Sequence, residues 1–74
     1  MQKTIEIHTE FIKLGQLLKI VNEITNGAEA KMYLEENNVV VNGEPEKRRG
    51  RKIYPGYNVE INDTIYVIGS KNND

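Results

Sequence analysis

The sequence predicts a small α+β domain in which two short helices pack on a mostly antiparallel sheet of four to five strands. Its 74 residues suffice for one hydrophobic core, so we expect a single domain. Apolar residues recur at three- and four-residue spacing between residues 11 and 34, which is typical of amphipathic helices. Residues 39–68 instead contain short apolar runs separated by Asn-Gly, Pro-Gly and Asn-Asp pairs, which indicates strands and turns.

The first elements are expected to be a strand and a helix. Residues 4–8 alternate apolar and polar side chains, which predicts a short strand. A helix should follow from residue 11 to about residue 22, and Ile24 should fold back onto the core. The buried stripe of this helix is predicted to be Phe11, Leu14, Leu17, Leu18 and Val21.

A second helix should begin at Asn26. Asn26 is a favourable N-cap, and Glu29 three residues later completes a capping box. The pair Asn37-Asn38 is expected to end this helix. Its buried residues are predicted to be Ala30, Tyr33 and Leu34.

The rest of the chain is predicted to form strands. Residues 39–41 are all valine, and Asn42-Gly43 is a strong hairpin signal, so residues 44–53 should form the return strand and its extension. Two further strands, at residues 59–61 and 64–68, follow turns at Pro55-Gly56 and Asn62-Asp63. We expect a core over about residues 11–68 and a frayed tail at residues 69–74.

Composition argues against several function classes. The chain has no cysteine and one histidine, His8, which falls on the outward face of the first strand, so neither a metal centre nor a catalytic site is indicated. No apolar run approaches the length of a membrane span, and the N-terminus lacks the apolar stretch of a signal peptide. We therefore expect a cytoplasmic protein that is not an enzyme and needs no cofactor.

Half of the positive charge lies in one segment, residues 47–52, which we call the basic run. It comprises Lys47, Arg48, Arg49, Arg51 and Lys52, with Gly50 between the second and third arginines. The remaining residues hold five basic residues and all eleven carboxylates, a formal charge of −6. Because neutralising phosphates releases counterions, this polarity favours nucleic-acid binding. The alternative is a solvated edge strand whose charges prevent aggregation.

Aromatic residues and a helix terminus add candidates. Tyr54 and Tyr57 flank the basic run, where their rings could stack on unpaired bases or pack in the core. The backbone amides of Asn26, Gly27 and Ala28 should be free at the start of the second helix, where a phosphate could approach. Lys13 and Lys31 could add charge nearby. Alternatively, Gly27 merely eases a tight turn between the helices.

Four segments occur in a recognisable order. They are Lys13-Leu14-Gly15-Gln16-Leu17-Leu18-Lys19, Gly27-Ala28-Glu29-Ala30-Lys31, Val39-Val40-Val41-Asn42-Gly43 and Tyr54-Pro55-Gly56. Their order resembles the RNA-binding domain named after small-subunit ribosomal protein S-four, whose αL motif is two helices followed by strands. The basic run with Ile53 is similar to that of the family's small stand-alone bacterial branch, the YaaA/YbcJ-like proteins.

The resemblance implies binding to structured RNA, commonly ribosomal or transfer RNA. By position, Lys13 opens the first helix, while Gly27 and Lys31 lie on the RNA-facing start of the second. Many members carry Ser-Arg where this chain has Asn26-Gly27, which shifts the predicted contacts toward the basic run. The full predicted site is Lys47, Arg48, Arg49, Arg51, Lys52, Lys13, Gly27, Lys31 and Tyr54.

The leading hypothesis is a monomeric, non-catalytic RNA-binding module that holds backbone phosphates and works in ribosome assembly or translation. A second hypothesis is a protein-interaction module that docks an acidic partner through its basic edge. A third is non-specific DNA binding by the basic run.

Overall fold

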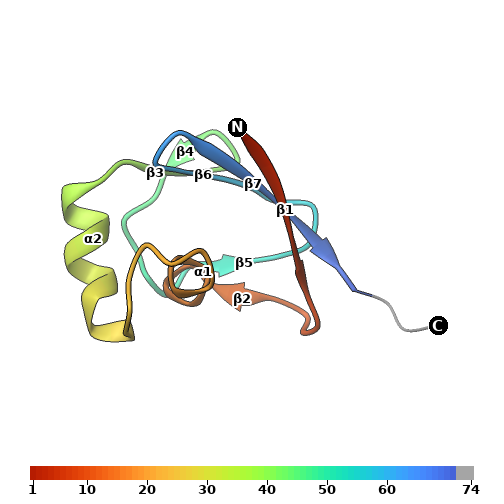
Figure 1. Ribbon diagram of the computed structural model, residues 1–74, viewed down its shortest axis with the longest axis horizontal. Coiled ribbons are helices and arrows are strands. Elements are labelled where there is room, and N and C mark those ends of the chain that lie inside the picture. Colours follow the sequence, from red (N-terminus) through yellow and green to blue (C-terminus); the bar gives the residue numbers. More distant parts are fainter. Residues whose placement is uncertain (72–74) are drawn as a thin grey trace.

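The computed structural model describes residues 1–71 and has the predicted α+β architecture. Figure 1 shows the larger sheet on one side of the molecule, with both helices and a small two-stranded ribbon on the other. The elements in chain order are β1 (Gln2–Ile7), β2 (Ile12–Lys13), α1 (Leu14–Ile20), the 3₁₀ helix η1 (Gly27–Glu29), α2 (Ala30–Glu36), β3 (Val39–Val41), β4 (Glu44–Pro45), β5 (Lys52–Ile53), β6 (Asn58–Ile61) and β7 (Thr64–Ser70).

The larger sheet has five strands in the order β1-β7-β6-β3-β4. Only the pairing of β1 with β7 is parallel, so the predicted mostly antiparallel sheet is confirmed. The register places Val39 opposite Ile61 and Val41 opposite Val59, which directs apolar side chains of neighbouring strands to one face.

Two hairpins follow the turn chemistry of the sequence. Asn42 and Gly43 have φ values of 51° and 85°, and Asn62 and Asp63 have 52° and 69°. Two consecutive left-handed residues are characteristic of a type I′ turn, whose twist matches that of the flanking strands. Both predicted turns are therefore confirmed.

The second helix begins as predicted. The Asn26 side chain accepts a hydrogen bond from the Ala28 amide at 3.0 Å, while Glu29 accepts from the amides of Thr25 and Asn26 at 2.9 and 3.0 Å. The first turn is a 3₁₀ helix, and α2 continues to Glu36, next to the predicted stop. The capping box is thus confirmed in detail.

The first helix begins later than predicted. Residues 11–13 are not helical, because Ile12 and Lys13 form β2 and pair with Ile53 and Lys52 of β5. Ile12 and Ile53 are both buried, so the extended backbone places two more apolar side chains in the core. Gln16 then caps α1 by accepting the Lys13 amide hydrogen bond at 2.9 Å.

The predicted return strand and its extension over residues 44–53 are confirmed only at the two ends, and residues 46–51 are not a strand. Only Glu44–Pro45 pairs with β3, residues 46–51 form a loop, and Lys52–Ile53 belongs to the separate ribbon. β4 ends at Pro45, and the next side chain, Glu46, is buried while its amide donates to the Val39 carbonyl of β3 at 2.9 Å. The basic run is therefore mainly a loop and not a sheet edge.

The expected tail is also shorter than predicted. Gly69 and Ser70 continue β7 and pair with Glu6 and Ile7 of β1, and the Lys71 amide donates to the Ile7 carbonyl at 3.0 Å. The rest of the predicted frayed segment, residues 72–74, lies outside the described residues.

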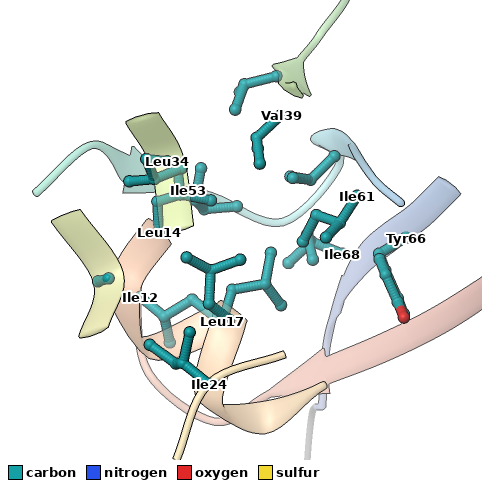
Figure 2. Packing of buried hydrophobic residues seen from close by; sticks show 14 of the residues in the cluster. Ile12, Leu14, Leu17, Ile24, Leu34, Val39, Ile53, Ile61, Tyr66 and Ile68 are labelled. Atoms are coloured by element: carbon teal, nitrogen blue, oxygen red, sulfur yellow. The ribbon is translucent and has the colours of Figure 1, made fainter. Parts of the chain in front are cut away.

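The core lies between the helices and the five-stranded sheet (Figure 2). Leu14, Leu17 and Leu18 of α1 are fully buried, as predicted, and Ile24 folds back onto them. The other buried apolar residues of the core are Ile7, Ile12, Ala30, Leu34, Val39, Val41, Ile53, Val59, Ile61, Tyr66 and Ile68. Both sheets contribute side chains to this core. The chain is therefore anchored before the basic run by Val41 of β3 and directly after it by Ile53 of β5.

Candidate nucleic-acid interface

The basic run is a loop docked on the first turn of α1. The amides of Leu14 and Gly15 donate to the carbonyls of Arg51 and Arg49, each at 2.9 Å. These bonds satisfy two amides that a helix leaves without intrahelical partners. A Cβ atom on Gly15 would lie 3.5 Å from the Arg49 carbonyl and 3.5 Å from the Ala30 side chain, which are ordinary van der Waals distances, so this position has room for one methyl group between the loop and α2 and not for a larger side chain.

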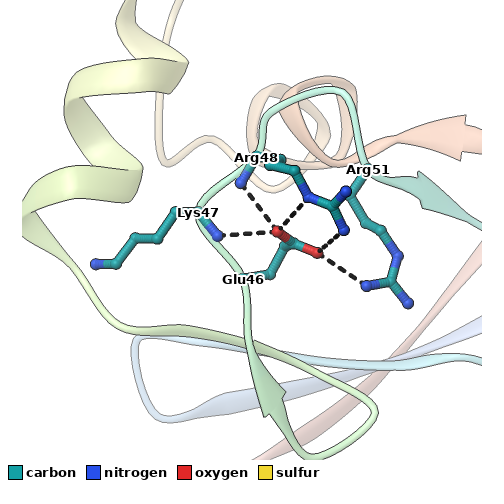
Figure 3. A network of polar contacts seen from close by, with 4 residues as sticks. All are labelled: Glu46, Lys47, Arg48 and Arg51. Atoms are coloured by element: carbon teal, nitrogen blue, oxygen red, sulfur yellow. Dashed lines mark hydrogen bonds and ion pairs between the residues drawn. The ribbon is translucent and has the colours of Figure 1, made fainter.

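Glu46 organises this loop from below (Figure 3). Its carboxylate accepts five hydrogen bonds: from the amides of Lys47 and Arg48 at 3.1 Å each, from Arg48 Nε at 3.0 Å, from Arg48 Nη2 at 3.1 Å and from Arg51 Nη1 at 2.8 Å. The Glu46 side chain is only 8% exposed. A buried carboxylate needs such partners, because removing its charge from water is costly.

The electrostatics of the cluster follow from this geometry. Hydrogen bonds from the Arg48 guanidinium lower the pKa of Glu46 to about 2, with further contributions from the Arg48 amide and Arg51. The same contacts raise the pKa values of both guanidinium groups above their usual range. Glu46 is therefore ionised at physiological pH and cancels part of the charge of the basic run.

Three of the five cations in the basic run have partners within the protein. Arg48 and Arg51 pair with Glu46, and Lys47 Nζ donates to the Leu34 carbonyl at 2.8 Å. The Arg48 side chain remains 75% exposed, whereas that of Arg51 is 28% exposed. The run is therefore not a uniform row of five free cations.

Arg49 and Lys52 face outward. Within residues 1–71, neither side chain makes a hydrogen bond or ion pair, and both residues are exposed. Lys52 Nζ lies 4.9 Å from the centroid of the Phe11 ring. These two side chains are the members of the run best placed to meet an external anion.

A cavity of about 360 Å³ lies where the loop, α1 and the start of the second helix meet. Three cations, Lys13, Lys19 and Arg49, line it with no carboxylate among its described lining residues. The other lining residues are Gly15, Gln16, Gly27, Ala30 and Gly50. The fold thus brings part of the basic run next to the opening of the second helix.

Lys19 was missed from the sequence. The signal for it was the three-residue spacing of Lys13, Gln16 and Lys19, which places the N-cap residue and two polar side chains of α1 on the same side of the helix. Lys31, which we did predict, is exposed near the start of α2 but does not line the cavity.

Lys13 and Lys52 are direct cross-strand neighbours in the β2–β5 ribbon. Like charges directly opposite one another destabilise a strand pair, and a bound anion between or beside them relieves the repulsion. Side chains alternate between the two faces of a strand, and the adjacent residues Ile12 and Ile53 are buried in the core. Both lysines therefore lie on the solvent side of the ribbon. The ribbon therefore extends the positive surface beyond the cavity.

The prediction of free amides at the start of the second helix is wrong for the amides of Asn26 and Ala28, which have acceptors within the protein. The Asn26 amide donates to Glu29, and the Ala28 amide donates to the Asn26 side chain. Hydrogen bonds from Thr25 and Asn26 lower the pKa of Glu29, so a negative charge lies at this terminus. Gly27 lines the cavity, but the helix start is not an amide-rich phosphate site.

Tyr54 and Tyr57 are half-buried and belong to a row of three rings. The centroid of the Tyr54 ring lies 5.5 Å from that of Phe11 and 5.7 Å from that of Tyr57. Arg51 lies 5.9 Å from the Tyr57 ring centroid. The predicted aromatic flank of the basic run is present, and Phe11, which we expected on a helix, is part of it.

The described part of the chain contains no cluster of side chains arranged to bind a metal ion. His8 is exposed, and residues 1–71 contain no group of three His, Asp or Glu side chains arranged to hold a metal ion. No helix among these residues is long and apolar enough to cross a bilayer.

The chain is similar in sequence to known proteins. The family described as S4 domain matches residues 5–69. A protein of Bacillus subtilis (strain 168) with the name "Probable ribosome maturation protein RlbA" is 52% identical over 61 residues, which cover 82% of this chain and 86% of that protein.

Proposed function

The chain belongs to the S4 domain family, and on this premise we propose that it is a non-catalytic RNA-binding protein that acts on ribosomal RNA during ribosome maturation. The name of the Bacillus subtilis relative supports the ribosomal setting. Such a protein works in the cytoplasm, and we expect it to act as a monomer.

One observation carries the proposal: a cavity that is lined by three cations and, within residues 1–71, by no carboxylate, in a chain of formal net charge −1. Lys13, Lys19 and Arg49 converge there, although acidic residues outnumber basic ones in the whole chain. Cations gathered against the overall charge favour a polyanion, whose phosphates release counterions when bound.

In this proposal the outward cations hold backbone phosphates. Lys13, Lys19, Arg49 and Lys52 each contact a phosphate oxygen, while Gly27 and Gly50 leave the cavity open to the RNA backbone. Recognition is of RNA shape, because this surface offers lysine ammonium groups and few side chains suited to reading base edges.

The remaining predicted cations have different roles. Arg48 is exposed enough to add a phosphate contact with the guanidinium N–H groups that Glu46 leaves free. Arg51 and Lys47 act mainly by fixing the loop, and Lys31 lies at the margin of the surface.

The test is a binding titration against a labelled hairpin from ribosomal RNA at several salt concentrations. The four outward cations, or five with Arg48, predict a slope of log affinity against log salt of about −4, at about −0.9 for each phosphate contact. Replacing Lys13, Lys19 or Arg49 by Ala should weaken binding to every RNA and reduce the slope by about 1 for each cation removed.

Lys3→Ala is the matched control, because Lys3 is an exposed lysine on β1 that does not line the cavity. It should leave the slope unchanged. The proposal fails if the wild-type protein binds no RNA at low salt, or if the triple variant of Lys13, Lys19 and Arg49 binds like Lys3→Ala. Binding an acidic protein in place of RNA would support the protein-docking alternative.

A further inference from the structure

Two aromatic rings lie outside the core, beside the lysines of the β2–β5 ribbon. Phe11 and Tyr54 are half-buried, with centroids 5.5 Å apart and ring planes at 45°. Among the described residues, the partly buried apolar side chains that pack against the core are Ile5, Val21, Tyr33 and Tyr57. Phe11 and Tyr54 are not among them, so core packing does not account for these two rings.

The position of Phe11 is fixed by its backbone. The Thr9 hydroxyl donates to the Phe11 carbonyl at 2.8 Å, and the next residue enters the β2–β5 ribbon through buried Ile12. Tyr54 directly follows β5 on the other strand of the same ribbon. The two rings are therefore held at one end of a short, well-anchored ribbon.

Cations border these rings. Lys52 Nζ lies 4.9 Å from the Phe11 ring centroid, and Lys13 is the cross-strand partner of Lys52. Phe11 precedes Lys13 by two residues, a span of at most about 7 Å along the chain. A phosphate bound at Lys13 and Lys52 and a base stacked on the two rings could therefore belong to the same nucleotide or to adjacent nucleotides of one RNA strand.

We propose that Phe11 and Tyr54, with Lys52, form a stacking site for one unpaired nucleobase of the bound RNA. This inference rests on the proposed function and adds a preference for RNA with a bulged or looped nucleotide next to a helix. The base must be unpaired, because the faces of a paired base are covered by its neighbours in the helix. Stacking tolerates any base, since every base has a π-face, while the lysines hold the adjacent phosphates.

Phe11 is the only phenylalanine in the chain, which allows a direct measurement. Uniform incorporation of 4-fluorophenylalanine gives a single ¹⁹F resonance that reports on this ring. Two RNA hairpins serve as probes, one with a bulged uridine and one with an abasic residue at the same place. The abasic RNA keeps the phosphate and removes only the base.

We expect wild-type protein to bind the bulged hairpin about 10-fold more tightly than the abasic one, which is within the range of one base–aromatic stack. The fluorine resonance should shift more with the bulged RNA. Phe11→Leu and Tyr54→Leu should bind both hairpins with the affinity that wild type has for the abasic RNA, and their salt slope should stay unchanged. Met32→Ala, which removes an exposed apolar side chain of α2, should keep the 10-fold preference.

Equal affinity of wild type for the two hairpins, with equal fluorine shifts, would overturn the stacking site and leave the phosphate surface standing. The affinities in this comparison come from the wild-type protein and the fluorine shifts from the same sequence labelled at Phe11, so neither depends on how well the variants fold. Absence of binding to either hairpin would instead overturn the proposed function itself.

Discussion

Replacing Glu46 by Gln tests whether this carboxylate holds the basic run in place. Glutamine has nearly the same size but loses the charge and one of the two acceptor oxygens. The carboxylate accepts five hydrogen bonds, three of them from guanidinium groups. An amide cannot satisfy all five, so Arg51, whose side chain is 28% exposed, would be left without its partner.

The size of the effect follows from the pKa of Glu46. A shift from 4.5 to about 2 corresponds to about 3 kcal/mol at about 1.4 kcal/mol per pKa unit. Solvent screens the contact with Arg48, whose side chain is 75% exposed, so we expect Glu46→Gln to lower the free energy of unfolding by about 2 kcal/mol. In a domain of this length, that loss lowers the melting temperature by about 10 °C.

The pH dependence has a definite sign. Because the folded state lowers the pKa of Glu46, its stabilisation is complete above about pH 4.5 and is lost as the pH falls toward 2. Urea unfolding followed by circular dichroism should therefore give a difference of about 2 kcal/mol between wild type and Glu46→Gln at pH 7. The difference should shrink toward zero near pH 2. Glu44→Gln, at an exposed carboxylate of β4, is the control and should change little.

RNA affinity provides a second test of Glu46→Gln, in which net charge and loop structure predict opposite results. Glu46→Gln raises the net charge by one unit, so simple charge counting predicts tighter binding. We expect weaker binding, because the loop that positions Arg49 in the cavity loses its anchor. Tighter binding together with a stability difference that does not change with pH would refute the role assigned to Glu46.

Two further predictions concern the elements around the cavity. Asn26→Ala removes the cap of the second helix and should cost about 1 kcal/mol in urea unfolding, whereas Asn38→Ala, an exposed residue beyond α2, should not. Gly15→Ala should be tolerated, since its Cβ would make ordinary 3.5 Å contacts, but Gly15→Leu should displace the loop at Arg49 and weaken RNA binding in the same titration while Gly15→Ala does not.

The parts of the fold that the sequence predicts correctly depend on local chemistry. The capping box at Asn26 and Glu29 and the turns at Asn42-Gly43 and Asn62-Asp63 are confirmed, because each is determined by residues within a few positions. The β2–β5 ribbon could not be predicted in this way. It joins Ile12 to Ile53, which are far apart in the chain, and two residues per strand are too few to give a periodic pattern.

The composition of the chain predicts which segment carries the positive charge, but it does not predict how the side chains of that segment are arranged. Charge density along the chain identifies the basic run, yet it cannot tell which cations face solvent. Glu46 directly precedes the run and was a visible signal, since a carboxylate next to several arginines commonly pairs with them. Its burial, which makes that pairing structural, depends on the chain leaving the sheet after Pro45.

Salt dependence tests whether the Glu46 cluster stays closed when RNA binds. The sequence nominated seven cations, namely Lys13, Lys31 and the five of the basic run, which would give a slope of about −6 if each contacted a phosphate. The structure directs four cations outward around the cavity and ribbon, while Glu46 neutralises one charge of the Arg48–Arg51 pair. A slope near −4 would therefore mean that the basic run is divided between holding the fold and binding RNA. A slope of about −5.4, which corresponds to six contacts, would mean that the Glu46 cluster opens when RNA binds, because only then can Arg48 and Arg51 both turn to phosphates.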